Sequence, residues 1–564
     1  MKRCPECRRD YYDDSLLYCL DDGSALLEGP ASGDEPTTAV MQVNNAPGEA
    51  PTLEQIPTTD KTTLPETAGP HRSNTKRLII VAVMLVVLAL GGYFGYGYLK
   101  GGGSDRINSI AVLPFENRSG NPDTDYLSDG LTDSLIFRFS QLPNVKVSPT
   151  SSVMRYKGVA TDVSQIAKDL DVDAVLSGRL TQIGDDLSIS VQLIDARTKK
   201  LVWAEQYDRK MADLLATQRE IATTLTQKMQ LHLAADEKGI TKKYTNSNEA
   251  YQLYLKGRYH WSKRTKDDLD KSVESFKQAI YLDPNFALAY VGMAEAYNSM
   301  AKDPDVAPKE AVPFAKSAAI RALELDSTLA EGHSALADAL AIYDWNWIDS
   351  ERGFKQAIEL DPNIGYIHIA YSGSFLSAAN RSDEAIREAE RGVELEPLSL
   401  INNSILASAY VLGRRYDKAL VQAQRTVDLD PNFPLGKFWV GLSYIANGKY
   451  DDAIAIGRDV PESAAGGNIL FVTALAYARS GRRAEAEQTI AKIKELGKTR
   501  YVRTYCIAWV YAALGDKDKA FAELEKSFED RDSYLGRARI DPFMDPLRDD
   551  PRFKDLMKRM NLTQ

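Results

Sequence analysis

Cysteine and histidine are scarce in this sequence, which limits the chemistry that its side chains can carry out. Only four cysteines occur among 564 residues, and three of them lie within the first 19. That distribution does not form a disulfide framework. The fourth, Cys506, lies inside a helical pattern, where we expect a small buried apolar residue. The five histidines are scattered; His333 and His368 stand near equivalent positions of a repeat, which suits either a helix surface or the lining of a groove.

The sequence motifs of common enzyme classes are also absent. There is no phosphate loop GxxxxGK[ST], no HExxH and no GxSxG elbow. The glycine-rich stretch GGYFGYG at 91–97 ends an apolar run and does not follow a strand, so we interpret it as helix packing or flexibility. The net charge of -10 argues against a general nucleic-acid binder, which would carry a basic surface. We therefore expect a protein that is not an enzyme.

An uncharged apolar run extends over residues 78–99. At a rise of ~1.5 Å per residue it spans about 33 Å as a helix, which matches the ~30 Å hydrocarbon core of a bilayer. The run lies too far from the N-terminus for a signal peptide, and the polar sequence on both sides argues against a buried core helix. Arg72, Lys76 and Arg77 crowd its N-terminal flank. We therefore predict one transmembrane helix with the N-terminus in the cytoplasm.

Composition and periodicity divide the remainder of the chain. Residues 1–28 carry three cysteines, and residues 29–77 are rich in Pro, Thr, Gly, Ala and Glu without a periodic apolar face. Such a segment buries too little apolar surface to fold, so 29–77 is expected to be a disordered linker. Residues 107–235 alternate between strand and helix patterns, which predicts an α/β domain. Residues 249–564 repeat.

The α/β domain is expected in the order β-α-β-α-β-β-β-α. A strand begins at Ile107, and a helix follows whose cap is Ser128 or Asp129, with Asp133 in its first turn. Gly184-Asp185-Asp186 predicts a tight hairpin. The other expected elements are strands at 145–149, 174–184, 186–196 and 201–209 and helices at 162–170 and 213–233.

The C-terminal half repeats with a constant period. Pro362, Pro397 and Pro431 are 35 and 34 residues apart. Paired helices with small residues where they approach, and with Pro ending the second helix, are typical of tetratricopeptide repeats. We predict about eight units with a C-terminal cap, an all-α solenoid. Three further series keep the register: Tyr410, Tyr444, Tyr477 and Tyr511; Ala419, Ala453, Ala486 and Ala520; and, in the turns, Gly413, Gly448, Gly481 and Gly515.

One unit departs from the repeat pattern. It carries the insertion MAKDPDVAPKEA, and Ser327 stands where other units have the closing proline. We expect its second helix to stop there nevertheless, because Asp326 and Ser327 favour a turn.

Several motifs together resemble a known family. SIAVLPFENRSGNPDTDYLSDGLTDSL, VSPTSSVMRYKG, DVDAVLSGRL and VQLIDARTKKLVWAEQYDR resemble, in this order, the TolB amino-terminal-like domain that precedes tetratricopeptide repeats in bacterial membrane-anchored signalling proteins. The resemblance covers 107–235 and implies a single-pass protein of the bacterial inner membrane, with its C-terminal domains outside the cytoplasm. Relatives commonly place a kinase, a cyclase or a winged-helix domain in the cytoplasm. In this chain the cysteine-bearing head takes that place.

The head resembles short bacterial zinc ribbons of the form CPxC…C-x-x-DG. Structural zinc takes four ligands, usually at two knuckles. Cys4 and Cys7 make one knuckle, and Cys19 with Asp22, at the position of a fourth cysteine, makes the other. Asp21 is adjacent, and water or a second chain could also complete the coordination. Free or redox-active cysteines on a disordered head are the alternative. Acidic residues offset the arginines of the head, which favours protein contact over DNA.

These observations predict a membrane-anchored scaffold or sensor. Stacked repeats build a continuous groove that binds segments of other proteins. Asn402, Asn403 and Ser404, on the first helix of one unit, are candidate groove residues. Trp345 and Trp347 flank a turn, where packing is expected and ligand stacking is the alternative. The alternative function is a transmembrane signal transducer whose zinc-ribbon head regulates transcription or a kinase.

Overall fold

The computed structural model describes residues 107–142, 145–159, 161–229, 242–303, 305–459 and 468–562, together with three short strands near the N-terminus. The chain divides into two compact units, Met1–Leu99 and Lys100–Gln564. In the first unit, β1 Lys2–Arg3 pairs antiparallel with both β2 Asp10–Tyr11 and β3 Leu27–Glu28. The predicted ligands Cys4, Cys7, Cys19 and Asp22, the linker 29–77 and the predicted membrane helix 78–99 lie outside the described residues. Within the described ranges, no helix has both the length and the apolar character to cross a bilayer.

The second unit begins with an α/β domain built on one mixed sheet. The strand order is β6-β4-β7-β8-β9, and β5 pairs with β7. β4 is parallel to β6 and β7, whereas β7, β8 and β9 form an antiparallel meander. The strands are β4 Ser109–Val112, β5 Glu116–Asn117, β6 Lys146–Val147, β7 Ala174–Ile183, β8 Asp186–Asp195 and β9 Lys200–Lys210; the helices are α2 Asp125–Ser140, α3 Thr150–Val153, α4 Val163–Leu170 and α5 Leu214–Lys228, with 3-10 turns η1 Pro122–Thr124, η2 Met154–Tyr156 and η3 Met211–Asp213.

The predicted hairpin between β7 and β8 is confirmed. Ile183 pairs with Asp186, so the loop is Gly184-Asp185, and Gly184 takes the positive φ of 59° that a two-residue hairpin requires. The alternation predicted for β8 is also present as far as Leu193, where its apolar residues are buried and its polar residues face the other side of the sheet; at the end of the strand Ile194 is half-buried and Asp195 is buried.

The first helix of this domain begins earlier than predicted. α2 starts at Asp125, so Ser128 and Asp129 lie inside the helix and are buried, and Asp125 rather than Asp133 is the acidic residue of the first turn. The 3-10 turn η1 leads directly into the helix, and no side chain caps it. The helix predicted at 162–170 is present as α4, Val163–Leu170, and the Asp162 side chain caps it by accepting a hydrogen bond from the Ser164 amide at 3.2 Å.

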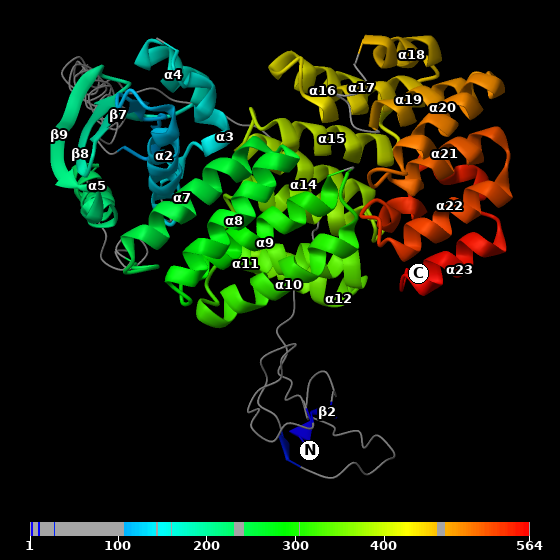
Figure 1. Cartoon of the computed structure of the whole chain (residues 1–564), viewed down its shortest axis with the longest axis horizontal. Coiled ribbons are helices and arrows are strands. Elements are labelled where there is room, and N and C mark those ends of the chain that lie inside the picture. Colours follow the sequence, from blue (N-terminus) through cyan, green and yellow to red (C-terminus); the bar gives the residue numbers. More distant parts are fainter. Residues whose placement is uncertain are drawn as a thin grey trace, which may run out of the picture. The chain divides into compact units, whose positions relative to one another are not determined.

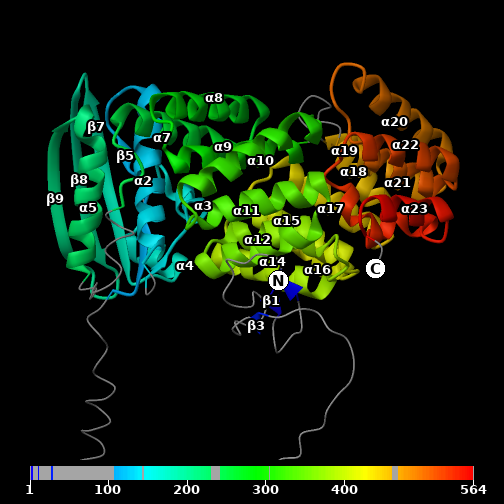
Figure 2. The same cartoon turned by 90° about the horizontal axis from the view of Figure 1, so that it is seen from below.

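The helices α2 and α5 lie between the sheet and the first repeat (Figures 1 and 2). Leu131, Leu135 and Phe139 of α2 are fully buried. A Cβ added at Gly130 of α2 would approach the Leu255 Cβ of the first repeat helix to 2.7 Å. The α/β domain and the repeats therefore share one core, which is continuous from the sheet into the first repeats.

The described helices from Asn248 to Glu529 form eight antiparallel pairs, which confirms the predicted number. Each first helix also contacts the first helix of the next pair, so the first helices form the inner face of the array. The pairs are α7 Asn248–Lys263 with α8 Lys266–Leu282, α9 Ala287–Lys302 with α10 Pro308–Leu325, α11 Ala330–Ala339 with α12 Trp347–Leu360, α13 Gly365–Ala370 with α14 Ser382–Leu395, α15 Leu400–Leu412 with α16 Tyr416–Leu429, α17 Pro434–Ala446 with α18 Tyr450–Asp459, α19 Asn468–Arg479 with α20 Arg483–Leu496, and α21 Thr504–Leu514 with α22 Lys517–Glu529.

Short helical turns extend this pattern. The first helices of the third and fourth pairs continue into π-helical turns, η4 Leu340–Asp344 and η5 Tyr371–Leu376. After the last pair come the 3-10 turns η6 Leu535–Arg539 and η7 Pro542–Leu547 and the helix α23 Pro551–Arg559. As predicted, α10 stops before Asp326 and Ser327 although the closing proline is missing.

Among the described residues, the turn in seven of the eight pairs contains one residue with a left-handed backbone. Gly448, Gly481 and Gly515 take φ values of 74°, 78° and 80° at this position. Gly413 lies in its turn as predicted, but its φ is -81°, and the next residue, Arg414, takes the positive value of 58°. In the first pair the same turn is made by Arg264, with φ 59°. Glycine is therefore favoured by this turn but is not obligatory.

The C-terminal residues fold back onto earlier repeats. The Trp345 ring lies 4.7 Å from the Phe528 ring, and the Arg531 guanidinium lies 3.9 Å over Trp345. Trp347 donates its indole N–H to the Met560 carbonyl oxygen at 2.8 Å. These contacts confirm packing as the role of the two tryptophans.

The same C-terminal segment covers the inner face of the later repeats. The Arg537 guanidinium lies 5.5 Å from the centre of the Trp439 ring of α17. Asp541, which is buried, accepts hydrogen bonds from the Tyr505 hydroxyl at 2.9 Å and the Trp509 indole at 3.0 Å, both on α21. An inner face that stays available to a partner must therefore lie in the earlier repeats.

Candidate partner-binding face

The first helices of the first four pairs, together with the turn after α7, carry a set of polar, charged and aromatic side chains that we name the inner-face cluster. Most of these side chains keep some exposed surface, whereas Glu295 and Asp338 are buried beneath them. Glu295 and Asp338 occupy equivalent positions of α9 and α11, and Glu331 and Tyr366 occupy equivalent positions of α11 and α13. The cluster comprises Arg258, Trp261, Arg264, Glu295, Ser299, Lys302, Glu331, Asp338 and Tyr366.

Two sets of ion pairs neutralise most of the cluster. Arg258 Nη1 lies 2.8 Å from Glu295 Oε2, and its Nε lies 3.1 Å from Asp133 Oδ2 of the α/β domain. Lys302 Nζ lies 2.6 Å from Asp338 Oδ2. The α/β domain therefore reaches the inner face through α2 and helps to set the charge there.

Aromatic contacts narrow the inner face between the first and the fourth pair. Trp261 of the first pair and Tyr366 of the fourth meet edge to face, with ring centres 6.2 Å apart. Arg503 of the last pair donates to the Lys302 carbonyl oxygen at 3.3 Å. Side chains can enter the narrowed face more readily than a main chain can. The long open groove expected from the repeat pattern is thus reduced to a short polar stretch.

Two charged members of the cluster have no ionic partner. Among the described residues, neither Arg264 nor Glu331 has an oppositely charged atom within 4.0 Å. Burial lowers the pKa of Arg264, although Tyr366 and Glu295 act in the opposite direction. Burial raises the pKa of Glu331 to about 7, and the charge of Glu295 adds to the effect. Both charges are thus poorly compensated within the chain, which is the condition in which an external charge would bind.

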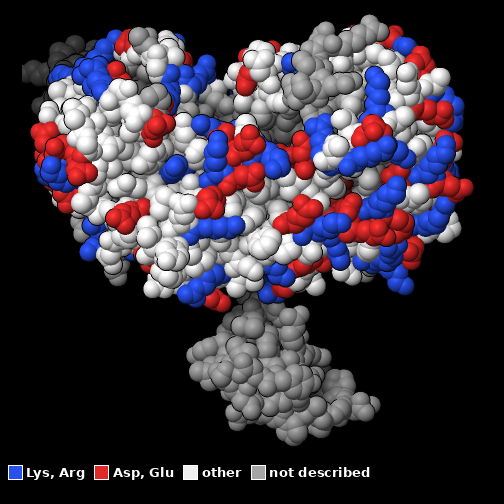
Figure 3. Space-filling view, in the orientation of Figure 1, with Lys and Arg blue, Asp and Glu red and all other residues white. Residues whose placement is uncertain are grey.

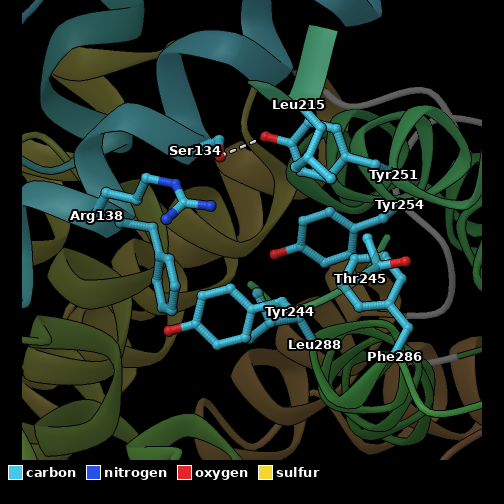
Figure 4. Close-up of a pocket in the computed structure, with 10 residues that line it drawn as sticks. Ser134, Arg138, Leu215, Tyr244, Thr245, Tyr251, Tyr254, Phe286 and Leu288 are labelled. Atoms are coloured by element: carbon cyan, nitrogen blue, oxygen red, sulfur yellow. Dashed lines mark hydrogen bonds between the residues drawn. The ribbon is translucent and has the colours of Figure 1, made fainter. Parts of the chain in front are cut away.

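A second candidate, a cleft at the junction of α2, α5 and α7, is a structural joint (Figure 4). Its volume is about 320 Å³ including the solvent at its mouth, and its enclosed part has room for at most about one water molecule. Ser134 Oγ lies 2.6 Å from the Tyr251 hydroxyl, which donates to Gln218 Oε1 at 2.7 Å. This network joins the three helices. The lining residues are Ser134, Phe137, Arg138, Leu215, Tyr244, Thr245, Tyr251, Tyr254, Phe286 and Leu288.

The structure places the predicted groove residues Asn402, Asn403 and Ser404 inside the array. Their exposed fractions are 1%, 0% and 0%. Asn402 Nδ2 donates to the Gly392 carbonyl oxygen and Asn403 Nδ2 to that of Pro397, both at 3.0 Å. The prediction that they line an open groove is therefore wrong, because the Asn402 amide binds the preceding helix α14 and the Asn403 amide binds the loop before α15.

The two repeat histidines have the same structural role as Asn403. His333 Nε2 lies 2.9 Å from the Ser327 carbonyl oxygen, and His368 Nε2 lies 3.0 Å from that of Pro362. A carbonyl oxygen can only accept, so Nε2 must carry the hydrogen in both rings. These residues join the turn between repeats to the next helix and do not line a binding face.

The remaining sequence predictions divide between tested and untested ones. Cys506 is fully buried on α21, as predicted. In the described part of the chain, no group of three or more Cys, His, Asp and Glu residues is arranged to hold a metal, but the four residues of the predicted zinc site are not in that part. Arg264, in the turn after α7, and Glu331, on α11, were not among the predicted residues.

The described surface shows no concentration of one charge on the side seen in Figure 3. Basic and acidic side chains are interspersed over the repeat helices that face the viewer. Local pairs such as Arg552 with Asp518, at 2.8 Å, account for this pattern. Specific recognition of a partner on this side would therefore depend on individual side chains and not on a broad electrostatic field of one sign.

Two family descriptions match parts of the chain. Residues 105–254 match the second domain of HilA/YgeH-like transcriptional regulators, and residues 253–286 match the tetratricopeptide repeat. The second match covers most of the α7–α8 pair, so the array is a tetratricopeptide array that starts there. The description matched by the α/β region differs from the TolB amino-terminal-like domain expected from its motifs, and that resemblance stays a prediction.

Individual relatives are similar over part of their lengths. A Rhizobium meliloti (strain 1021) protein that is named as an adenylate cyclase is 29% identical over 235 residues, 41% of this chain and 40% of that protein. Transcriptional regulator HilA of Salmonella typhimurium is 26% identical over 295 residues, 51% of each. The chain thus spans about half the length, or less, of these curated relatives. The solved structure of YrrB, described as a TPR protein with an unusual peptide-binding site, is 20% identical with a TM-score of 0.25, over 34% of this chain and 96% of that one.

Replacing Glu331 with glutamine should stabilise the protein at neutral pH and above. The folded state holds the Glu331 pKa at about 7, above its usual value of 4.5, so folding favours the protonated carboxyl. Wild-type stability contributed by this group is therefore lost as pH rises from 4.5 to 7. We expect Glu331→Gln to exceed wild type by about 1–2 kcal/mol at pH 8 and to equal it at pH 4.5.

Chemical denaturation of both proteins at the two pH values measures this difference. Glu359→Gln, at an exposed position of α12, is the matched control and should follow wild type at both pH values. An equal gain for Glu331→Gln at pH 4.5 and pH 8 would mean that the carboxyl charge is not its cause.

Proposed function

We propose that this protein is a membrane-anchored scaffold or sensor that binds other proteins through its tetratricopeptide repeats. The observation that carries the proposal is the inner-face cluster, in which Arg264, in the turn after α7, and Glu331, on α11, present uncompensated charges on the inner face of a repeat array. Inner faces of stacked repeats bind segments of partner proteins. No catalytic role is part of the proposal, although one relative is named as an adenylate cyclase.

Partner capture tests the scaffold role. The full-length chain, cross-linked in its source cells and purified in detergent, should recover at least one protein that a double variant, Arg264→Gly with Glu331→Gln, recovers in much lower yield. Arg425→Gln, at an exposed position of α16, is the matched control and should recover the same protein as wild type. Equal recovery by all three proteins, or recovery of none, would count against binding through this face.

The membrane anchor in this proposal is the uncharged run at 78–99. Its length suits one bilayer crossing, and Arg72, Lys76 and Arg77 on its N-terminal side favour a cytoplasmic N-terminus. The repeats and the α/β domain would then lie outside the cytoplasm of a bacterial cell, at the inner membrane.

Reporter fusions check this orientation. Alkaline phosphatase fused after Gly103 should be active, because it folds only outside the cytoplasm, whereas the same reporter fused before Leu78 should be inactive. Green fluorescent protein at the two positions is the reciprocal control. The opposite pattern would place the repeats in the cytoplasm and contradict the proposed topology.

The head is proposed to be a structural zinc site with Cys4, Cys7, Cys19 and Asp22 as ligands. The short antiparallel strands β1, β2 and β3 support a small folded head, and so short a segment rarely folds without a metal or another covalent constraint. Thiolate and carboxylate are both ligands that zinc accepts.

Metal analysis of the purified full-length chain tests this site. Wild type should hold about one zinc per chain, and Cys19→Ser and Asp22→Ala should each lower that content. Cys506→Ala is the control, since that thiol is fully buried on α21, and it should keep the zinc. Unchanged zinc in Asp22→Ala together with loss in Cys19→Ser would exclude Asp22 as the fourth ligand.

A second candidate function is favoured by the family match over residues 105–254. That match is to a domain of transcriptional regulators, which supports a transmembrane signal transducer whose head acts on transcription or on a kinase. A gene for an orphan regulator beside the gene of this protein would favour the signalling role over a passive scaffold.

A further inference from the structure

The Arg264 side chain is held in place without an ionic partner. Its Nη1 donates to Ser299 Oγ at 2.5 Å, and its guanidinium carbon lies 3.7 Å from the centre of the Trp261 ring and 6.0 Å from that of Tyr366. A guanidinium carries five N–H donors. With one of them engaged, the others remain for an acceptor that the described residues do not supply.

The carboxylates whose charges act on Arg264 are already engaged by other groups. Glu295 Oε2 accepts from Arg258 Nη1 at 2.8 Å, and Glu396 Oε2 accepts from the Ser151 hydroxyl at 3.0 Å. Neither comes within ion-pair distance of Arg264. The net effect of its surroundings is therefore dominated by burial, which disfavours the charged form.

The backbone at Arg264 is also unusual for an arginine. Its φ of 59° lies in the left-handed region, which is sterically unfavourable for a residue with a Cβ. Gly448, Gly481 and Gly515 fill the same turn in later repeats. A glycine at position 264 should therefore keep the turn and remove only the side chain.

We propose that Arg264 binds the carboxylate of an aspartate or glutamate side chain that belongs to a partner protein. A guanidinium fork matches a carboxylate through two parallel N–H···O bonds, and stacking on Trp261 fixes the plane of the fork. A side chain enters here, and not a main chain, because Trp261 and Tyr366 narrow the inner face. This assignment rests on the proposed function, binding of proteins by the repeats.

Binding of the full-length chain to an array of 12-residue peptides tests the assignment. The peptides are acetylated and amidated at their ends and come in matched pairs, one with Glu or Asp and one with Gln or Asn at the same positions. We expect wild type to bind some acidic members at least about tenfold more tightly than their neutral partners, as one charge-assisted bidentate pair would give. Arg264→Gly should bind the acidic and the neutral members with equal affinity, and its affinity for the neutral members should equal that of wild type.

Two further arms make the outcomes distinct. Arg264→Lys keeps the charge without the fork, so it should retain only part of the preference for acidic over neutral peptides. The midpoint temperature of thermal unfolding of Arg264→Gly should equal or exceed that of wild type. An acidic preference that persists in Arg264→Gly, or that appears only with free C-terminal carboxylates, overturns the assignment and leaves the proposed function standing. Absence of binding to any peptide, by wild type as well as variants, overturns both.

Discussion

The close approach of the two helices in every repeat depends on one small buried side chain near the start of the second helix. At this position the chain has only alanine or serine, and the exposed fraction never exceeds 2%. Where serine stands, its hydroxyl donates to a carbonyl oxygen of the first helix, as Ser272 does to Gly257 and Ser350 to Ala337, both at 2.8 Å. A larger residue would force the helices apart. The eight residues are Ser272, Ala315, Ser350, Ala385, Ala419, Ala453, Ala486 and Ala520.

Helix pairs that are close together can also stack closely on the next pair. The inner face of the stacked array has two parts, one in the later repeats and one in the earlier repeats. In the later repeats the C-terminal segment covers it: the Arg503–Asp532 pair, with side chains 2% and 0% exposed, belongs to that packing. In the earlier repeats the face stays polar, and the α/β domain contributes Asp133 to its ion pairs. The face proposed to bind partners therefore depends on elements from both ends of the second unit and not on the repeats alone.

Most of the local structure could be predicted from the sequence, because it is set by neighbouring residues. The hairpin at Gly184-Asp185 follows from turn chemistry, and the helix α4 follows from its apolar spacing. The start of α2 could not be predicted, since a 3-10 turn without a side-chain cap leads into it. The candidate site was mislocated for a different reason: asparagines such as Asn402 are polar on any helix, and only packing shows that their amides bind backbone carbonyls inside the array.

The sequence alone determined the period of the repeats, the small residue in the later pairs and the succession of the main strands and helices along the α/β domain, since each depends on spacing along the chain. The tertiary structure decided which charged residues of the inner face stay available to a partner. Arg264 and Glu331 are ordinary charged residues in the sequence, and they become uncompensated only because Arg258, Lys302 and their acidic partners pair with each other across helices far apart in the chain. Pairing of that kind depends on distance in space, which spacing in the sequence does not give.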